Sequence, residues 1–193
     1  ETIKKIEKIL EERKLERKDL LEPVARSLFK LMAYKDEYEV ARAYTDASYQ
    51  RKLDAQFDGD YKIKFYFSPP LISKKDPVTG RALKKEFGPS IMWLLRLLAP
   101  LKILRGSVLD PFGYLPERKK ERQLIENYHS LLDEIIKNLN SENYNLAVDL
   151  VALPMQIRGF GHVKDQAIKK FEQEEQNILE KFRAISLGKR TAG

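Results

Sequence analysis

The sequence predicts a mainly α-helical protein, a single-domain helical bundle with a small β-hairpin or strand inserted around residues 61–87. Apolar residues recur at spacings of three and four through most of the chain, which is the period of amphipathic helices. Residues 61–67 instead alternate as a strand does, and most of the Pro and much of the Gly lie between residues 59 and 114. A chain of 193 residues is long enough for one hydrophobic core.

Residues 1–22 predict an N-terminal helix with highly charged middle turns. Two interpretations remain open: the helix packs its ends on the body, or it connects to a preceding domain. Residue 1 is Glu rather than Met, which suggests an excised piece. We expect residues 23–185 to form the helical body and residues 186–193 to form a flexible basic tail.

A new helix is expected to begin at Pro23, because the missing N–H of proline is tolerated at a helix start. One long or lightly broken helix is expected to about Thr45, and a second over residues 47–57 with Tyr49, Leu53 and Phe57 facing inward. The tyrosines in this region have helical spacing, which indicates core positions with hydroxyls at the rim rather than a stacking surface. They are Tyr34, Tyr38, Tyr44 and Tyr49.

The strand at 61–67 places its aromatic and aliphatic side chains on one side and its lysines on the other. Its backbone needs a partner, for which residues 71–73 and 81–86 are the candidates. The intervening residues 76–80 have the composition of a turn.

Residues 91–98 are apolar on nearly every side, which predicts a helix in the centre of the bundle with Trp93 in the core. Leu101, Ile103 and Leu104 are expected to continue buried, and residues 110–114 to form a turn whose two aromatics close the edge of the core. Residues 116–139 then carry the strongest apolar stripe, followed by a helix from Ser141 to Leu153 and a last helix from about Val163.

Positive charge is concentrated in the non-helical part of the chain. Residues 61–105 hold ten Lys and Arg against two acidic residues, a net charge of +8 where the whole chain carries +7. Such a basic loop is a candidate surface for an acidic partner. The candidate partner-binding residues are Lys62, Lys64, Lys74, Lys75, Arg81, Lys84 and Lys85.

Residues 157–164 form a second motif, in which two glycines precede a helix start flanked by cationic side chains. Free N–H groups there favour an anion site, while the glycines equally suit a tight turn between helices. The candidate anion-binding residues are Arg158, Gly159, Gly161, His162 and Lys164.

Composition excludes several functions. Without Cys the chain has no disulfide, no thiolate nucleophile and no cysteine ligands for an iron–sulfur cluster or zinc, and two His make a His-rich metal site implausible. No catalytic residue and no metal ligand is assigned, and no membrane interaction is expected. A cytoplasmic setting is compatible with this composition.

Five blocks in order resemble a known family: residues 28–44, 61–70, 76–88, 105–114 and 158–164. Together they are similar to the domain of unassigned function at the C-terminal end of fused indolepyruvate ferredoxin oxidoreductases, of the 2-oxoacid:ferredoxin oxidoreductase family. The resemblance covers about residues 26–182. It implies a parent enzyme that oxidatively decarboxylates an aryl 2-oxoacid to an acyl-CoA, using thiamine diphosphate, iron–sulfur clusters and coenzyme A.

None of that catalytic machinery is matched here, because the chain has no cluster cysteines and no Gly-Asp-Gly…Asn segment for thiamine diphosphate. The resemblance therefore implies a non-catalytic accessory or assembly domain, without a cofactor of its own, whose partners are the remaining domains of the parent. Within that parent, the cluster at 158–164 is a candidate site for the coenzyme A phosphates or a substrate carboxylate.

Two alternative functions stay open. The basic loop suits docking of an acidic electron carrier such as ferredoxin, because complementary charge speeds encounter. Nucleic-acid binding is compatible with the net charge of +7 and with the alternation of Tyr and Lys in the strand, although no known nucleic-acid motif is present.

Overall fold

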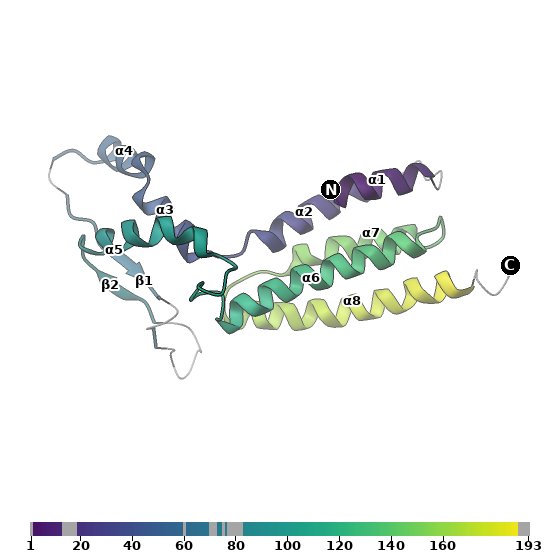
Figure 1. Ribbon diagram of the computed structural model, residues 1–193. Coiled ribbons are helices and arrows are strands. Elements are labelled where there is room, and N and C mark those ends of the chain that lie inside the picture. The colour runs from purple at the N-terminus through teal and green to yellow at the C-terminus, as the bar shows by residue number, and fades with distance from the viewer. Residues whose placement is uncertain are drawn as a thin grey trace. The chain divides into compact units, whose positions relative to one another are not determined.

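The computed structural model describes residues 2–12, 19–59, 61–69, 73–74, 76 and 83–188. It confirms a mainly helical protein with one small two-stranded antiparallel sheet (Figure 1). The chain divides into two compact units: unit 1 comprises residues 1–34 and 120–193, and unit 2 comprises residues 35–119. The domain boundaries expected near residues 23 and 185 stay predictions.

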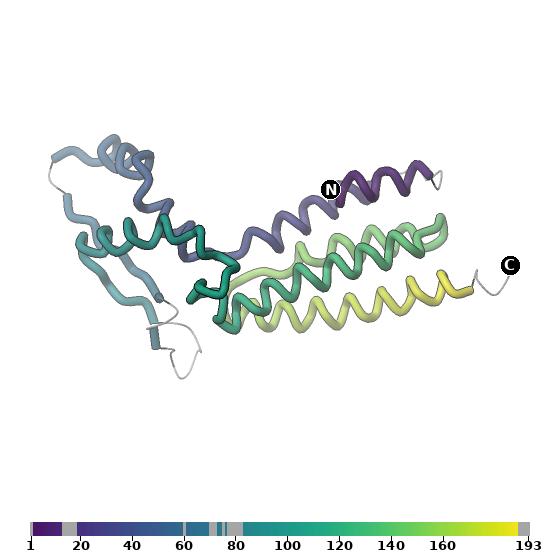
Figure 2. Tube along the Cα trace, viewed as in Figure 1, coloured from purple at the N-terminus to yellow at the C-terminus, as the bar shows by residue number. Residues whose placement is uncertain are grey.

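Unit 1 is a helical bundle whose members run side by side in Figure 2. Its elements are α1 (Thr2–Glu12), α2 (Leu21–Met32), α6 (Pro116–Asn138, in this unit from residue 120), α7 (Tyr144–Ala152), the 3-10 helix η2 (Leu153–Gln156) and α8 (His162–Gly188). The apolar stripe predicted on α6 forms the centre of the core. Ile6 and Leu10 of α1 are buried in the same core, so the N-terminal helix packs on the body. A connection to a preceding domain stays a prediction.

Buried polar groups inside unit 1 are satisfied by hydrogen bonds, as burial requires. The hydroxyls of Ser27 and Tyr128 both donate to the carbonyl oxygen of Val151, at 2.7 and 2.8 Å. Asn143 is fully buried at the start of α7, and its side-chain amide donates to the Asn138 carbonyl and the Ser186 hydroxyl, each at 2.9 Å. These bonds fix the turn between α6 and α7 against the end of α8.

Unit 2 is built on α3 and a short hairpin. Its elements are α3 (Glu37–Thr45), α4 (Ala47–Gln56), β1 (Phe65–Phe67), β2 (Lys85–Phe87), α5 (Ile91–Leu98) and the 3-10 helix η1 (Ala99–Leu104). Both α5 and η1 pack on α3. The strands pair antiparallel with Phe65 opposite Phe87, so β2 overlaps the second of the two predicted partner segments. Tyr44 packs edge-on against the rings of Phe65 and Phe67, which joins α3 to the hairpin.

The alternation predicted for residues 61–67 is confirmed, because the aromatic and aliphatic positions are buried or half-buried and Lys62, Lys64 and Tyr66 are exposed. Tyr38 is also a core residue as predicted, with 2% of its surface exposed. Its hydroxyl donates to Asp110 at 2.9 Å, and its ring meets Phe112 edge-on at 5.2 Å.

Two buried carboxylates bind the 105–114 segment to the start of α3. Asp36 caps α3 by accepting from the N–H groups of Tyr38 and Glu39, and it also pairs with Arg105. Asp110 accepts from the Tyr38 hydroxyl, from the N–H of Gly106 at 3.0 Å and from the N–H of Phe112 at 3.1 Å. Hydrogen bonds, an ion pair and the ring contact between Phe112 and Tyr38 therefore hold the loop to α3.

Acid is expected to destabilise unit 2 through Asp110. Burial alone raises the pKa of this carboxyl, but hydrogen bonds from Gly106, Tyr38, Gly113 and Phe112 outweigh it and hold the pKa below its ordinary value of 3.8. A depressed folded-state pKa contributes stability that is complete above the unfolded value and is lost as the pH falls through the folded value. Unfolding of unit 2 should therefore begin below about pH 4, as followed by amide NMR signals of residues 36–46.

The Asp110→Asn variant tests this assignment. It should be less stable than the parent at pH 7 and lose less of that stability on acidification, because the titrating group is gone. Glu39 leaves a residual dependence, since hydrogen bonds from Lys102 and Arg42 lower its pKa to about 2. An unchanged acid profile would mean that Asp110 does not contribute.

Several predicted core positions are wrong. The α5 helix is not central: Leu95 is buried, whereas Trp93 is 71% exposed and Leu94 and Leu97 are about half exposed. Leu101 and Ile103 of η1 are exposed, as is Phe57, which ends the α4 segment. Of the two aromatics in the 110–114 turn, Phe112 packs inward and Tyr114 is exposed. The physical reason is that α5 packs on α3 with one face only.

Candidate functional sites

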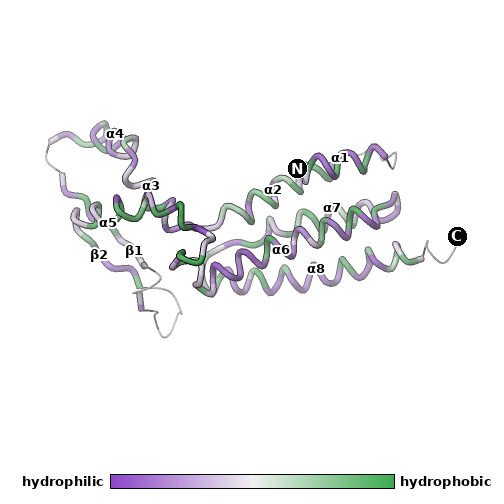
Figure 3. Tube along the Cα trace, viewed as in Figure 1, coloured by the Kyte–Doolittle hydropathy of each residue, from purple (hydrophilic) through white to green (hydrophobic). Residues whose placement is uncertain are grey.

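An exposed apolar face runs along α5 and the segment after it. Trp93, Leu94 and Leu97 lie on one side of the helix, opposite Ile91, Leu95 and Leu98, which are buried or half-buried. Exposed apolar side chains continue along the chain at Leu101, Ile103, Val108 and Leu109. Figure 3 shows this stretch as largely hydrophobic. We call these seven residues the α5 face.

Scattered exposed apolar residues are normal on a protein surface, but a contiguous set is typical of an interaction site. In the α5 face, the exposed fraction is 86% for Ile103, 82% for Val108 and 71% for Trp93. Periodicity does not predict this surface, because a helix that is apolar on nearly every side gives no signal for the side that stays exposed. Arg96 within the helix and Pro100 after it are the signals in the sequence against a fully buried segment.

The basic loop lies partly on the hairpin. Lys62, Lys64, Lys74, Lys84 and Lys85 are exposed, while Lys75 and Arg81 lie outside the described residues. Lys64 pairs with Glu86 at 2.8 Å across the sheet, and Glu86 also accepts from the hydroxyl of Tyr66 at 2.6 Å. Within the described ranges, no carboxylate pairs with the other four lysines.

Part of the positive charge in residues 61–105 is structural. Lys102 pairs with Glu39 and Arg105 pairs with Asp36, so both cations bind η1 and the following loop to α3. Among the described cations of residues 61–105, the exposed ones without a carboxylate partner are Arg96 on α5 and the set Lys62, Lys74, Lys84 and Lys85, which we call the hairpin lysines.

The 158–164 segment connects η2 to α8, as the tight-turn interpretation expected. Gly159 has φ +91°, and a Cβ there would lie 2.7 Å from Cγ1 of Val163, so the position requires glycine. Gly161 has φ +55° and accepts through its carbonyl from the N–H of Asp165 in the first turn of α8. The two glycines turn the chain into the first turn of α8.

The predicted anion-site residues are only partly brought together. Lys164 is half-buried and pairs with Glu121 at 2.6 Å, and His162 lies 3.2 Å from the side chain of Gln166 on its own helix. Arg158 is exposed, and its guanidinium pairs with no carboxylate in the part of the chain that the structure describes.

Lys30 of α2 belongs to this cationic cluster and was missed in the sequence, 128 residues before Arg158. Its ammonium donates to the carbonyl oxygen of Met155 at 2.6 Å. Burial first, and then the charges of Arg158 and Lys164, lower the pKa of Lys30. Because Met155 stands three residues before Arg158, this hydrogen bond also joins α2 to the loop that carries Arg158.

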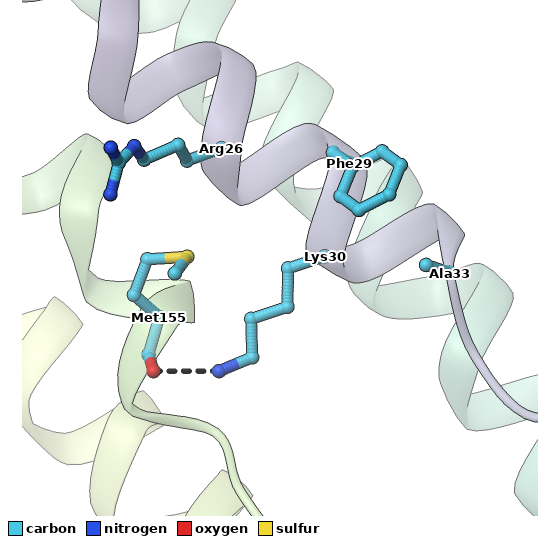
Figure 4. A pocket seen from close by; sticks show the side chains of 5 residues that line it. All are labelled: Arg26, Phe29, Lys30, Ala33 and Met155. Carbon is cyan, nitrogen blue, oxygen red and sulfur yellow. Dashed lines mark hydrogen bonds between the residues drawn. The ribbon is translucent and has the colours of Figure 1, made fainter.

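A shallow pocket of about 430 Å³ adjoins this cluster in unit 1. Figure 4 shows its lining side chains, with the Lys30 ammonium turned toward the Met155 carbonyl and Arg26 across the opening. Phe29, Ala33 and Met155 supply the apolar part of the lining. Phe29 is 72% exposed, so the pocket has an open apolar wall.

No group of three or more His, Asp or Glu is placed to hold a metal ion within the described residues. None of the helices in those residues combines the length and apolarity that crossing a membrane requires.

Comparison with known proteins places the chain in a family without assigning an activity. Residues 1–177 match the family of unknown function DUF6537. No curated protein and no solved structure matches the chain. Because the match extends over most of the 193 residues, the chain belongs to the family of unknown function DUF6537.

Proposed function

We propose that this chain is a non-catalytic accessory domain that assembles with the catalytic part of an indolepyruvate ferredoxin oxidoreductase-like enzyme. The resemblance of five ordered sequence blocks motivates the choice of parent. The thiamine diphosphate and iron–sulfur clusters of such a parent do not fit this chain, which has no Cys and no matching diphosphate-binding segment. We therefore assign no step of the reaction to its residues.

The α5 face is the observation that carries the proposal. An apolar surface with Trp93 at 71% and Ile103 at 86% exposure is unfavourable in water, and burial stabilises it by about 25 cal/mol per Å². Aromatic and aliphatic side chains at the centre of an interface contribute most of its binding energy. In this proposal the face packs on the catalytic part.

The hairpin lysines favour a second function, docking of an acidic electron carrier. Four exposed ammonium groups without a carboxylate partner in the described ranges produce a local positive potential. Such a potential mainly raises the rate of encounter with a negatively charged protein and is screened by salt.

One experiment separates the two functions. Turnover of the fused oxidoreductase is measured with and without this region, using ferredoxin or an artificial dye as electron acceptor. The accessory proposal expects equal losses with both acceptors, because the active site loses its support. Loss with ferredoxin alone would favour carrier docking, and full activity and assembly without the region would contradict both.

If carrier docking holds, replacing Lys74, Lys84 and Lys85 with Gln should slow ferredoxin reduction at low salt and leave dye reduction unchanged. The matched control replaces Lys119, Lys169 and Lys170 with Gln, which removes the same charge outside the hairpin. An equal effect of the control set, or the same salt dependence as the unmodified enzyme, would contradict docking at the hairpin.

A further inference from the structure

The cation cluster of unit 1 is assembled from segments far apart in the sequence. Lys30 lies on α2, Arg158 on the loop after η2 and Lys164 on α8. The bond from the Lys30 ammonium to the Met155 carbonyl joins α2 to this loop, and the start of α8 approaches the loop where a Cβ at Gly159 would lie 3.5 Å from the backbone nitrogen of Lys164. Only Lys164 has a carboxylate partner among the described residues, which is Glu121. Lys30 donates its hydrogen bond to a neutral carbonyl, and no carboxylate of the described residues pairs with its charge.

Like charges held together in a folded protein repel one another, and burial adds a desolvation cost for the charged form. Favourable interactions in the rest of the fold offset the free-energy cost of this repulsion and desolvation. An anion bound between the cations would reduce that cost. Lysine and arginine bind carboxylate and phosphate groups through charge-assisted hydrogen bonds. The cluster is therefore suited to the anionic group of a ligand.

The pocket beside the cluster suits an apolar group. It shares Lys30 with the cluster, and its wall includes Phe29, Ala33 and Met155 (Figure 4). It is an open, shallow pocket of about 430 Å³, so a bound apolar group would keep one side in water. An aromatic or aliphatic body can pack on Phe29 and Met155 while its anionic group reaches Lys30.

We infer that unit 1 carries a binding site for a small amphiphilic anion, a carboxylate or phosphate joined to an apolar body, formed by Lys30, Arg158, Phe29 and Met155. Arg26 lines the opposite side of the opening and pairs with Glu22 at 2.6 Å. The site does not depend on the accessory function proposed above, since the α5 face belongs to unit 2.

The test is an amide NMR titration of the 193-residue chain with phenyl phosphate. Inorganic phosphate, which lacks the ring, and benzyl alcohol, which lacks the charge, are the comparison probes. Phenyl phosphate should give saturable shifts confined to residues 26–33 and 155–164, and each comparison probe should bind at least several-fold more weakly. Binding should also raise the pKa of Lys30 toward its ordinary value, because the anion stabilises the ammonium.

Arg158→Gln is the decisive variant, since the side chain is exposed and its loss does not threaten folding. It should weaken phenyl phosphate binding about tenfold, the effect of losing one charge-assisted contact. Lys84→Gln removes the same charge from the hairpin and should leave binding unchanged. Equal weakening by the two variants, equal binding of inorganic phosphate, or no saturation at millimolar concentration would overturn the site.

Discussion

Replacing Phe182 with Ala is expected to lower the free energy of unfolding of unit 1 by about 3–5 kcal/mol. Phe182 lies on α8 with 0% of its surface exposed and belongs to the core formed with α1, α2, α6 and α7. Truncation removes the buried ring and leaves a cavity, because a close-packed core relaxes only in part. Urea denaturation followed by far-ultraviolet circular dichroism measures the loss.

Leu187→Ala is the matched control for Phe182→Ala. It removes an apolar side chain five residues further along the same helix, where 59% of the residue is exposed. The expected change is within about 0.5 kcal/mol, as is usual for surface positions. Equal losses at the two positions would contradict the packing of α8 described above.

Replacing Trp93 and Leu97 together with Ser is expected to abolish assembly with the catalytic part while leaving the fold intact. Trp93 is 71% exposed and Leu97 about half exposed, so their removal creates no closed cavity in unit 2. Residues at the centre of an interface commonly contribute about 2 kcal/mol or more each, which corresponds to roughly thirtyfold in affinity per residue. Sedimentation of the chain mixed with the catalytic part measures the change.

The control for the α5 face is the pair Met32→Ser and Leu187→Ser. These residues are 56% and 59% exposed and lie in unit 1, so the same kind of apolar surface is removed away from the α5 face. Assembly should be unchanged in this pair. A loss as large as that of the Trp93 and Leu97 pair would indicate a general effect of surface hydrophobicity rather than a specific interface.

The sequence was most informative where one apolar stripe faces one core. The α6 prediction succeeds because the apolar stripe persists from Leu124 to Ile136, more than three turns, so its direction is unambiguous. The prediction for the strand at 61–67 succeeds for the same reason, since the alternation of apolar and polar residues distinguishes its buried side from its exposed side.

The α5 prediction failed because a helix that is apolar on nearly every side does not reveal which of its sides is buried. How many other elements pack against such a helix is decided by the whole fold. Long-range polar contacts are equally invisible to periodicity. The bond between Tyr38 and Asp110 joins residues 72 apart, and that between Lys30 and Met155 joins residues 125 apart. Sequence patterns therefore suggest Arg158 and Lys164 as candidates for an anion site but give no sign of Lys30, whose position depends on how α2 packs on η2.

The most direct test of the accessory function uses Trp93, the only Trp in the chain. The chain is labelled with 5-fluorotryptophan, and its single fluorine resonance is followed as the unlabelled catalytic part is added. The proposed interface predicts a solvent-isotope shift for the free chain, in keeping with an exposed ring, which is lost in the assembled enzyme. Assembly with the resonance and its isotope shift unchanged, or no assembly at all, would contradict the account.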